Sequence, residues 1–453
     1  MVKRTLFGTD GIRGEANHHP MTAELAMGLG RVLGLRLRGV PGHRTKVLVG
    51  KDTRQSGYLI ESALTAGLCS AGADVYLLGP LPTPGIAFMT TGMRCDAGVV
   101  ISASHNPFQD NGIKIFGRDG YKLADEIEAE LESALQSTGE SGRALPRGTG
   151  IGKAFRIEDA AGRYAVHCKT AFPKDLTLEG LKIVVDCAHG AAYRVAPEVL
   201  EELGASVIAV ACEPDGTNIN RDCGALHPGN IARLVRETGA HLGIALDGDA
   251  DRCILCDENG EIVDGDQVLA LLGRRMKQHG HLPGDTVVAT VMSNVGLERA
   301  LAEVGVRLER VGVGDRYVVE RLRSGGFALG GEQSGHVVMI DHATTGDGLV
   351  TSLSVLGVMV REQRPLSELA ACMTRYPQVL KSVSVRERRD LSTLPEVMRL
   401  VVDVERRLGD SGRVLVRYSG TELLARVMVE GKDEIEIRGH VDEIAAALAK
   451  AVG

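Results

Sequence analysis

The chain has 453 residues, of which 44% are hydrophobic and 25% charged, so it is typical of a folded protein too long for one hydrophobic core. A formal net charge of -7 and only 3% aromatic residues argue against a nucleic-acid partner, which would favour a basic face or base-stacking rings. No apolar run approaches the roughly 20 residues that span a bilayer, and the nine cysteines are an odd, scattered set. We therefore expect a cytoplasmic protein of several domains, with no membrane partner and no disulfide framework.

Three stretches repeat one order of predicted elements. Each has a β-branched strand, a polar turn, a helical segment, a glycine and a second strand. They cover residues 45–79, 181–210 and 285–314. This order is the signature of a βαβ unit, and three such units about a hundred residues apart predict three related α/β domains.

The last segment has a different pattern. Strand-like KSVSV is followed by a helical stretch at 393–408, the strands RVLVRYSG and LARVMVE, and a helical stretch at 434–452. This alternation predicts a smaller C-terminal α+β domain. The expected fold class is therefore α/β with four domains, three of them related α/β domains with βαβ units in mixed sheets. The predicted bounds are 1–160, 161–262, 263–375 and 376–453.

Three acidic residues alternate with small ones in ALDGDADRCILCD. In an extended loop between two strands, Asp247, Asp249 and Asp251 would point to one side, where a hard cation such as Mg²⁺ or Ca²⁺ could gather them. One alternative is a solvated acidic turn. An EF-hand loop is rejected because Arg252 stands where its sharp turn needs glycine, and because the flanks are strand-like.

The stretch VISASHNPFQDNGIKIF is a β-branched strand that ends in two serines. Ser104 and His105 follow the strand, and Lys114 lies on the next one, so all three could meet at one loop mouth. Neighbouring Ser and His rarely form a hydrolytic triad, and the GxSxG elbow is absent from this stretch. The alternative is that the hydroxyls only cap a turn.

Glycine-rich loops supply the remaining candidates. GGEQSGH offers groups that bind sugar hydroxyls, and RYSGTELLAR offers hydroxyls and guanidiniums that suit a phosphate. FGTDGIRG contains Thr9 and Arg13, and Lys51 and Arg54 follow the strand KVLVG, where ligands of α/β proteins usually lie. Each loop could instead be an ordinary polar turn or a salt-bridged surface loop.

The motifs FGTDGIRG, SASHNP with NGIK, DGDADR, GEQSGH and RYSGTE, in this order, resemble those of the α-D-phosphohexomutases over all 453 residues. Gln333 and the opening FGTDGIRG favour the branch that converts glucosamine 6-phosphate to glucosamine 1-phosphate, an early step toward UDP-N-acetylglucosamine. The alternative branch is phosphomannomutase/phosphoglucomutase. Leu423 departs from the family, which usually has a proline that stiffens this turn.

The resemblance implies an isomerase with four domains around a central cleft. Ser104, rather than its neighbour Ser102, would carry a phosphoryl group and exchange it through glucosamine 1,6-bisphosphate. One Mg²⁺ would bind Asp247, Asp249, Asp251 and an oxygen of the phosphoserine at Ser104. The implied roles of the other residues are phosphoryl stabilisation or proton transfer for Arg13, Lys114 and His336; sugar binding for Glu332, Gln333 and Ser334; phosphate binding for Arg417, Ser419, Gly420, Thr421 and Arg426; and support for Thr9, His105 and Arg252.

The expected partner is a small hexosamine phosphate, and a homodimer is also considered. Two rival functions use the same motifs. A phosphosugar-binding protein without catalysis would keep the binding loops, but the intact Ser104 and three aspartates argue against it. A calcium-binding protein built on DGDADR would need no phosphorylated serine.

Overall fold

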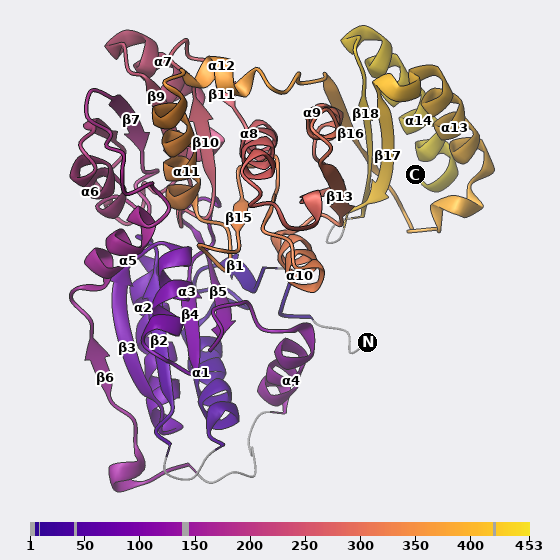
Figure 1. Cartoon of the computed structure of the whole chain (residues 1–453). Coiled ribbons are helices and arrows are strands. Elements are labelled where there is room, and N and C mark those ends of the chain that lie inside the picture. Colours follow the sequence, from indigo (N-terminus) through magenta and orange to yellow (C-terminus); the bar gives the residue numbers. More distant parts are fainter. Residues whose placement is uncertain (1–4, 9, 40–42, 138–144, 420–422) are drawn as a thin grey trace. The chain divides into compact units, whose positions relative to one another are not determined.

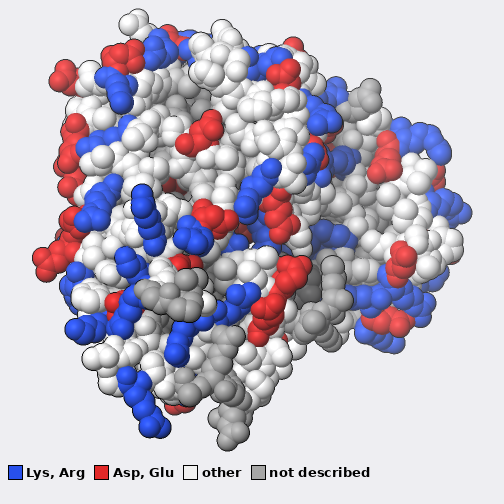
Figure 2. Space-filling view, turned by 60° about the horizontal axis from the view of Figure 1, so that its bottom comes forward, with Lys and Arg blue, Asp and Glu red and all other residues white. Residues whose placement is uncertain are grey.

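The computed structural model describes residues 5–8, 10–39, 43–137, 145–419 and 423–453 (Figure 1). The chain forms two compact units, one from Met1–Met292 with Leu308–Ala371 and the other from Ser293–Arg307 with Cys372–Gly453. Among the described residues, no helix has both the length and the apolar character needed to cross a bilayer. On the face shown in Figure 2, basic and acidic side chains are interspersed.

The first sheet is mixed and has the strand order β1-β5-β4-β2-β3-β6. Strands β4, β2, β3 and β6 run parallel, whereas β5 is antiparallel to both β4 and β1. The strands are β1 (Ile12–Glu15), β2 (Lys46–Lys51), β3 (Asp74–Pro80), β4 (Ala97–Ile101), β5 (Asp110–Gly117) and β6 (Ala154–Arg156), and the helices are α1 (Ala23–Leu37), α2 (Ser56–Ser70), α3 (Thr83–Gly92) and α4 (Asp125–Gln136).

Alternate residues of this sheet pack into different layers, as the two-residue period of a strand requires. Val47 and Val49 of β2 join a core with residues of α1, α2 and α4. On the opposite face, Gly50 and Gly98 leave room for Ile86 and Thr90 of α3. Helices therefore cover both faces, and the carboxyl ends of β2 and β4 are left free to carry loops (Figure 1).

The second sheet has the order β11-β10-β9-β7-β8, and its strands β9, β7 and β8 are parallel, with β8 at the edge. Strand β10 returns antiparallel to β9 after a short loop. The elements are α5 (Ala160–Lys169), β7 (Lys182–Asp186), α6 (Val195–Glu202), β8 (Ser206–Val210), α7 (Gly229–Thr238), β9 (Leu242–Leu246), β10 (Cys253–Cys256) and β11 (Ile262–Val263). Cys253 and Cys256 are both buried on β10.

The third sheet has the order β13-β12-β14-β15, with β12 and β14 parallel and β15 antiparallel to β14. Helix α9 belongs to the same compact unit as the C-terminal residues, whereas β12 belongs to the other unit. The elements are α8 (Gly265–Gln278), β12 (Thr286–Thr290), α9 (Val295–Ala302), β13 (Arg307–Val311), α10 (Asp315–Gly325), β14 (Leu329–Gly331), β15 (Val337–Met339), α11 (Gly348–Glu362) and α12 (Leu366–Ala370).

The C-terminal sheet is antiparallel with the order β16-β18-β17. Its inward valines, among them Val427 and Val429, pack on Val397 of α13 and Ile444 of α14. The elements are β16 (Gln378–Ser384), α13 (Pro395–Leu408), β17 (Arg413–Tyr418), β18 (Leu424–Glu430) and α14 (Glu434–Val452). Three mixed sheets with helices, and a smaller antiparallel sheet packed on α13 and α14, confirm the predicted fold class.

Candidate active site

Ser104 lies in the loop that leaves the carboxyl end of β4. It is 1% exposed, and its φ of 51° places a non-glycine residue in the left-handed region, a strain that is often found at functional sites. Its Oγ donates a hydrogen bond of 2.7 Å to Asp247 Oδ2 and lies 3.2 Å from His105 Nδ1. The serine hydroxyl is therefore held against a carboxylate of the second sheet's loop.

Ser102 supports the Ser104 loop through two hydrogen bonds. Its Oγ donates to Asp52 Oδ2 at 2.6 Å and accepts the backbone N–H of Ser104 at 2.9 Å. With both directions of its hydroxyl used and 0% exposure, Ser102 is a structural neighbour of Ser104. The second serine is thus committed to shaping the loop.

Arg54 and Lys51 are paired with carboxylates. The sequence left open whether these cations face a ligand or form a salt-bridged surface loop, and both are buried. Lys51 pairs with Glu61, and Arg54 pairs with Asp52 at 2.8 Å. Arg54 also donates to backbone carbonyls of the serine loop, those of Ser104, Asn106, Pro107 and Asp110. Arg54 is therefore a buried support of the serine loop, held by the Asp52 carboxylate and by these four carbonyls.

Asn220, which follows β8 of the second sheet, also holds the serine loop by hydrogen bonds. Its Nδ2 donates to the carbonyl of Ser104 at 2.8 Å and to that of Asn106 at 3.1 Å, while its own N–H donates to Ala188. Gly248 approaches so closely that an added Cβ would lie 2.6 Å from the Ser104 carbonyl oxygen. The serine loop and the acidic loop are therefore packed directly on one another.

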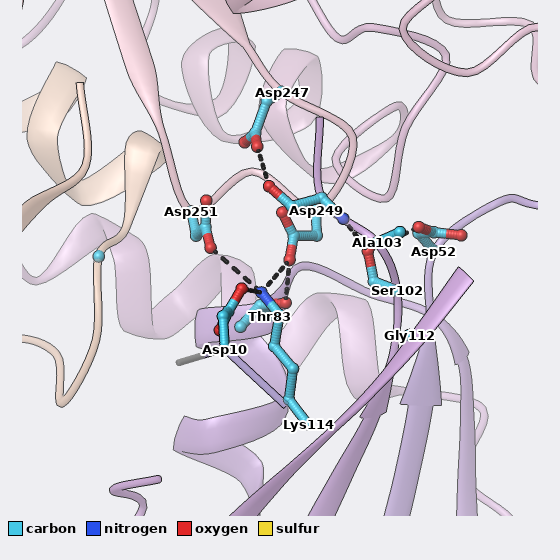
Figure 3. Close-up of polar contacts among 12 residues, drawn as sticks. Asp10, Asp52, Thr83, Ser102, Ala103, Gly112, Lys114, Asp247, Asp249 and Asp251 are labelled. Atoms are coloured by element: carbon cyan, nitrogen blue, oxygen red, sulfur yellow. Dashed lines mark hydrogen bonds and ion pairs between the residues drawn. The ribbon is translucent and has the colours of Figure 1, made fainter. Parts of the chain in front are cut away.

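Asp247, Asp249 and Asp251 occupy the loop between β9 and β10, and one oxygen from each lies within 4.8 Å of the others. Figure 3 shows the three carboxylates converging around one space, as the alternating pattern predicts. Burial and the carboxylates of Asp251 and Asp249 raise the pKa of Asp247 well above its usual value. The flanking elements are strands, which confirms the rejection of an EF-hand.

The acidic cluster fits a bound divalent cation. Asp249 Oδ1 and Asp251 Oδ1 are buried without a hydrogen-bond partner among the described residues. Buried oxygens are rarely left in this state, and an oxygen-only set of carboxylates is what Mg²⁺ and Ca²⁺ prefer. The other oxygen of Asp249 accepts from Thr83 at 2.7 Å and from Lys114 at 3.0 Å.

Lys114 lies on β5 with its Nζ among three carboxylates. The ammonium is 3.2 Å from Asp10, 3.0 Å from Asp249 and 3.5 Å from Asp251 (Figure 3). Burial alone would lower its pKa, but Asp10, Asp249 and Asp251 together raise it well above its usual value. Lys114 therefore stands as a buried cation beside the serine and acidic loops.

A chain of alternating charges continues from Asp10 toward the third sheet. Asp10 pairs with Arg13 and with Lys122, and Lys122 pairs in turn with Asp315 at the start of α10. Asp315 Oδ2 lies 3.6 Å from His336 Nε2. The structure thus brings the predicted residues Arg13, Lys114 and His336 into one network with the serine loop, since Arg13 also donates to the Ala103 carbonyl at 3.2 Å.

Sequence reasoning missed several members of this network. Asp10 was contained in FGTDGIRG, and its place between glycines three residues before Arg13 was a usable signal. Asp315 follows the third repeat in VGVGD, at the end of a strand where site residues often lie. Lys122 and Thr83 carry no local signal, because their partners are more than a hundred residues away.

The GEQSGH loop carries three polar side chains that differ in their exposure to solvent. Glu332 is half-buried and accepts from the N–H of Gly314 at 3.2 Å and from Ser334 at 3.4 Å. Gln333 donates to Asp264 at 3.4 Å, and Ser334 is exposed. Gly335 has a φ of 90°, and a Cβ there would lie 2.3 Å from the Cys253 carbonyl oxygen, so glycine is required for this turn.

The supporting residues lie as follows. Burial, Arg252 and Arg13 lower the pKa of His105 to about 4, so the imidazole is neutral at pH 7. Arg252 donates its backbone N–H to Asp247 at 3.2 Å, and its Nε is 3.9 Å from Asp251. Thr9 lies outside the described residues.

The predicted phosphate loop belongs to the C-terminal unit. Arg417 on β17 and Arg426 on β18 are direct partners in the strand register. Burial and the charge of Arg426 lower the pKa of Arg417, so the two guanidiniums repel each other. Ser419 is 4% exposed at the end of β17, and Gly420 and Thr421 lie outside the described residues. Like charges at directly paired positions of neighbouring strands are destabilising.

Comparisons with known proteins cover nearly the whole chain. The models of phosphoglucomutase/phosphomannomutase alpha/beta/alpha domains I, II and III match residues 4–141, 163–260 and 264–376, and that of the C-terminal domain matches 380–447. A phosphoglucosamine mutase from Anaeromyxobacter sp. (strain Fw109-5) is 60% identical over 457 aligned residues, which cover 100% of this chain and 97% of the relative.

Solved structures share the fold. A phosphoglucomutase/phosphomannomutase family protein from Burkholderia thailandensis superposes with a TM-score of 0.81 at 26% identity, covering 100% of this chain and 98% of that one. An N-acetylphosphoglucosamine mutase from Aspergillus fumigatus, in complex with GlcNAc-6P and magnesium, has a TM-score of 0.68 at 17% identity, covering 100% and 96%. The second likeness shows the fold alone.

Proposed function

The chain belongs to the phosphoglucomutase/phosphomannomutase family, and from this premise we propose that it interconverts glucosamine 6-phosphate and glucosamine 1-phosphate. As a member of this family the chain is a sugar-phosphate mutase, an isomerase. The substrate assignment is supported by relatives named phosphoglucosamine mutase at 60% and 59% identity over the full chain. The observation that carries the proposal is the hydrogen bond between Ser104 and the acidic cluster.

Ser104 is proposed as the phosphoryl carrier. Moving a phosphate between two hydroxyls of one sugar needs a temporary acceptor. The phosphoserine passes its phosphoryl group to the sugar's free hydroxyl, which gives glucosamine 1,6-bisphosphate, and the other phosphate then returns to Ser104. Phosphoryl transfer depends mainly on positioning and charge neutralisation, and the supports from Ser102, Arg54 and Asn220 fix the position of this hydroxyl.

Mg²⁺ is the proposed cation of the acidic cluster. Asp247, Asp249 and Asp251 would hold it with an oxygen of the phosphoserine, and when bound it would neutralise charge on the transferring phosphoryl group. Lys114 and Arg13 would add positive charge from the same side, since both already lie in the ion-pair network around Asp10. His336 is proposed to assist from the third sheet.

Two further loops are proposed to recognise the substrate. Glu332, Gln333 and Ser334 would bind the sugar hydroxyls and the amine, because the Glu332 carboxylate accepts hydrogen bonds and the Gln333 and Ser334 side chains both donate and accept them. The repelling pair Arg417 and Arg426, with Ser419, Gly420 and Thr421, would bind the phosphate that is not reacting. Thr9, His105 and Arg252 are proposed as supports of the serine and acidic loops.

The remaining expectations stay predictions. They are the domain bounds 1–160, 161–262, 263–375 and 376–453, the central cleft, the cytoplasmic location, the absence of nucleic-acid and membrane partners, and the homodimer. Phosphomannomutase/phosphoglucomutase activity stays the alternative.

A coupled assay tests the substrate assignment. The full-length chain is supplied with Mg²⁺ and with glucosamine, glucose or mannose phosphate at matched concentrations, with the Ser104→Ala variant as the blank. We expect the highest kcat/KM on the glucosamine phosphate. An equal or higher kcat/KM on glucose or mannose phosphate would assign the chain to the alternative branch, and binding without turnover of any of them would indicate a non-catalytic phosphosugar binder.

A further inference from the structure

Two thiols of the second sheet lie next to each other outside the proposed chemistry. Cys187 follows β7, and Cys212 lies two residues after Val210, the partner of Asp186 in the parallel pairing of β7 with β8. The backbone N–H of Cys187 donates to the Val210 carbonyl at 3.1 Å, and Cys212 Sγ donates to the same carbonyl oxygen at 3.3 Å. This shared contact places the two cysteines side by side at the carboxyl ends of β7 and β8, the arrangement that a disulfide between neighbouring strands requires.

The two thiols differ in access and acidity. Cys187 is fully buried, whereas Cys212 is half-buried. Interaction with the Cys187 side chain lowers the pKa of Cys212, and burial opposes this less strongly. The same interaction and burial raise the pKa of Cys187. Cys212 is therefore the accessible thiol with more thiolate character, and Cys187 stands behind it as a resolving partner.

The residues that follow Cys187 contact both functional loops. The carbonyl of Ala188 accepts from Asn220, the residue that fastens the Ser104 carbonyl. Gly190 lies so close to the acidic loop that an added Cβ would be 2.4 Å from the Gly248 oxygen. A movement of the Cys187 backbone is thus transmitted to the serine loop through Asn220 and to the acidic loop through Gly248.

We propose that Cys187 and Cys212 form a reversible disulfide with hydrogen peroxide as oxidant, and that this disulfide slows turnover. The Cys212 thiolate attacks one oxygen of the peroxide, which breaks the O–O bond, forms a sulfenic acid and releases water once the leaving oxygen is protonated. The sulfur of Cys187 then attacks the sulfur of Cys212, the S–S bond forms, and the sulfenic oxygen leaves as a second water. Two thiols lose two electrons and two protons, and one peroxide is reduced to two waters.

Disulfide formation changes the site because it draws the two sulfurs together to about 2.05 Å. The backbone between Cys187 and Gly190 has no free space on the Gly248 side, so the strain passes to the loops. A displacement of about 1 Å at reacting groups can cost about 100-fold in rate. We expect turnover to fall by at least about tenfold in the oxidised chain.

The experiment treats the reduced full-length chain with hydrogen peroxide, blocks the remaining thiols with an alkylating agent and maps the peptides by mass. We expect a loss of about 2 Da and a peptide pair joining Cys187 with Cys212, with recovery of both mass and turnover after dithiothreitol. The Cys212→Ser variant should keep its basal turnover and resist peroxide. Cys187→Ser serves as the second variant, and Cys69→Ser, which removes another half-buried thiol, should behave as the unaltered chain.

Each outcome decides the proposal. A different cysteine pair, or no disulfide at low peroxide, would overturn the modification site. A Cys187–Cys212 disulfide with unchanged turnover would overturn its effect on the loops. The mass readout does not depend on the proposed mutase activity, so absence of that activity and absence of the disulfide are distinguishable.

Discussion

The hydroxyl of Ser104 and the carboxylate of Asp247 are joined by a 2.7 Å hydrogen bond, although the residues are 143 positions apart in the chain. This bond links the loop after β4 of the first sheet to the loop after β9 of the second. It places the proposed phosphoryl acceptor beside the only cluster of three acidic side chains found among the described residues that could hold a metal ion. Residues that hold these two loops together should therefore affect the rate of turnover, although they do not react themselves.

Gly248 sets the distance between the two loops. In Gly248→Ala the new Cβ would lie 2.6 Å from the Ser104 oxygen and 2.8 Å from Asn220 Nδ2. We expect kcat to fall on the order of 100-fold and the free energy of unfolding to fall by about 1–3 kcal/mol, because the loops must separate. Steady-state kinetics and urea unfolding measure both. The control Gly162→Ala, where no atom lies within 4 Å, should leave kcat unchanged and should not lower the free energy of unfolding, because alanine favours the helix α5. Near-normal turnover in Gly248→Ala would contradict this role.

Arg54 and Asp52 form a fully buried ion pair beneath the serine loop. Arg54→Lys cannot reproduce the planar set of donors to the loop carbonyls, and it leaves Asp52 poorly compensated. We expect the free energy of unfolding to fall by about 3–5 kcal/mol, measured by urea unfolding. The exposed pair Arg163 and Asp159 provides the control, because Arg163→Lys should have an effect of less than about 1 kcal/mol. Equal effects of the two substitutions would show that burial of Arg54 is unimportant.

Local patterns in the sequence predicted much of this arrangement. Alternating β-branched strands and helical stretches predicted the four sheets, and the Asp-x-Asp-x-Asp spacing in an extended loop predicted the acidic cluster. The role of Arg54 stayed open, because a cation after a strand has the same local pattern whether it faces a ligand or a buried carboxylate. Asn220, Thr83 and Lys122 could not be predicted, since their partners come from distant segments that only tertiary packing brings together.

The facing guanidiniums of Arg417 and Arg426 should be relieved by an anion. We expect added inorganic phosphate to raise the melting temperature of the chain, and Arg417→Met to remove most of that rise and increase KM for the sugar phosphate by at least about tenfold. Thermal unfolding with and without phosphate, together with kinetics, checks this. Arg438→Met removes an exposed guanidinium of the same unit that already pairs with Glu434, and it should leave both quantities unchanged. If phosphate raised the melting temperature of Arg417→Met as much as that of the unaltered chain, the proposed role of Arg417 in phosphate binding would be contradicted.

Asp347 should make stability depend on pH. Burial raises its pKa from 3.8 to about 6, against the hydrogen bonds from Val350, Tyr164 and Leu349. The folded chain then binds the proton more tightly than the unfolded chain, so this group's contribution is present below pH 4 and lost as the pH rises through about 6. The loss is on the order of 3 kcal/mol.

The Asp347→Asn variant isolates this effect, because asparagine keeps the helix cap but does not titrate. Urea unfolding at pH 4.5 and 7.5 should show the variant gaining stability relative to the unaltered chain at the higher pH. Parallel changes of the two proteins between these pH values would rule out the raised pKa.

The most direct test of the central claim is the phosphorylation state of Ser104. Intact mass and peptide mapping of the chain after exposure to glucosamine 1,6-bisphosphate should show a fraction about 80 Da heavier, with the phosphate on Ser104. Ser104→Ala should lose both this fraction and turnover, whereas Ser102→Ala should keep the phosphate and turn over more slowly, because it loses only the support of the loop. Phosphate on Ser102, or full turnover by Ser104→Ala, would contradict the account.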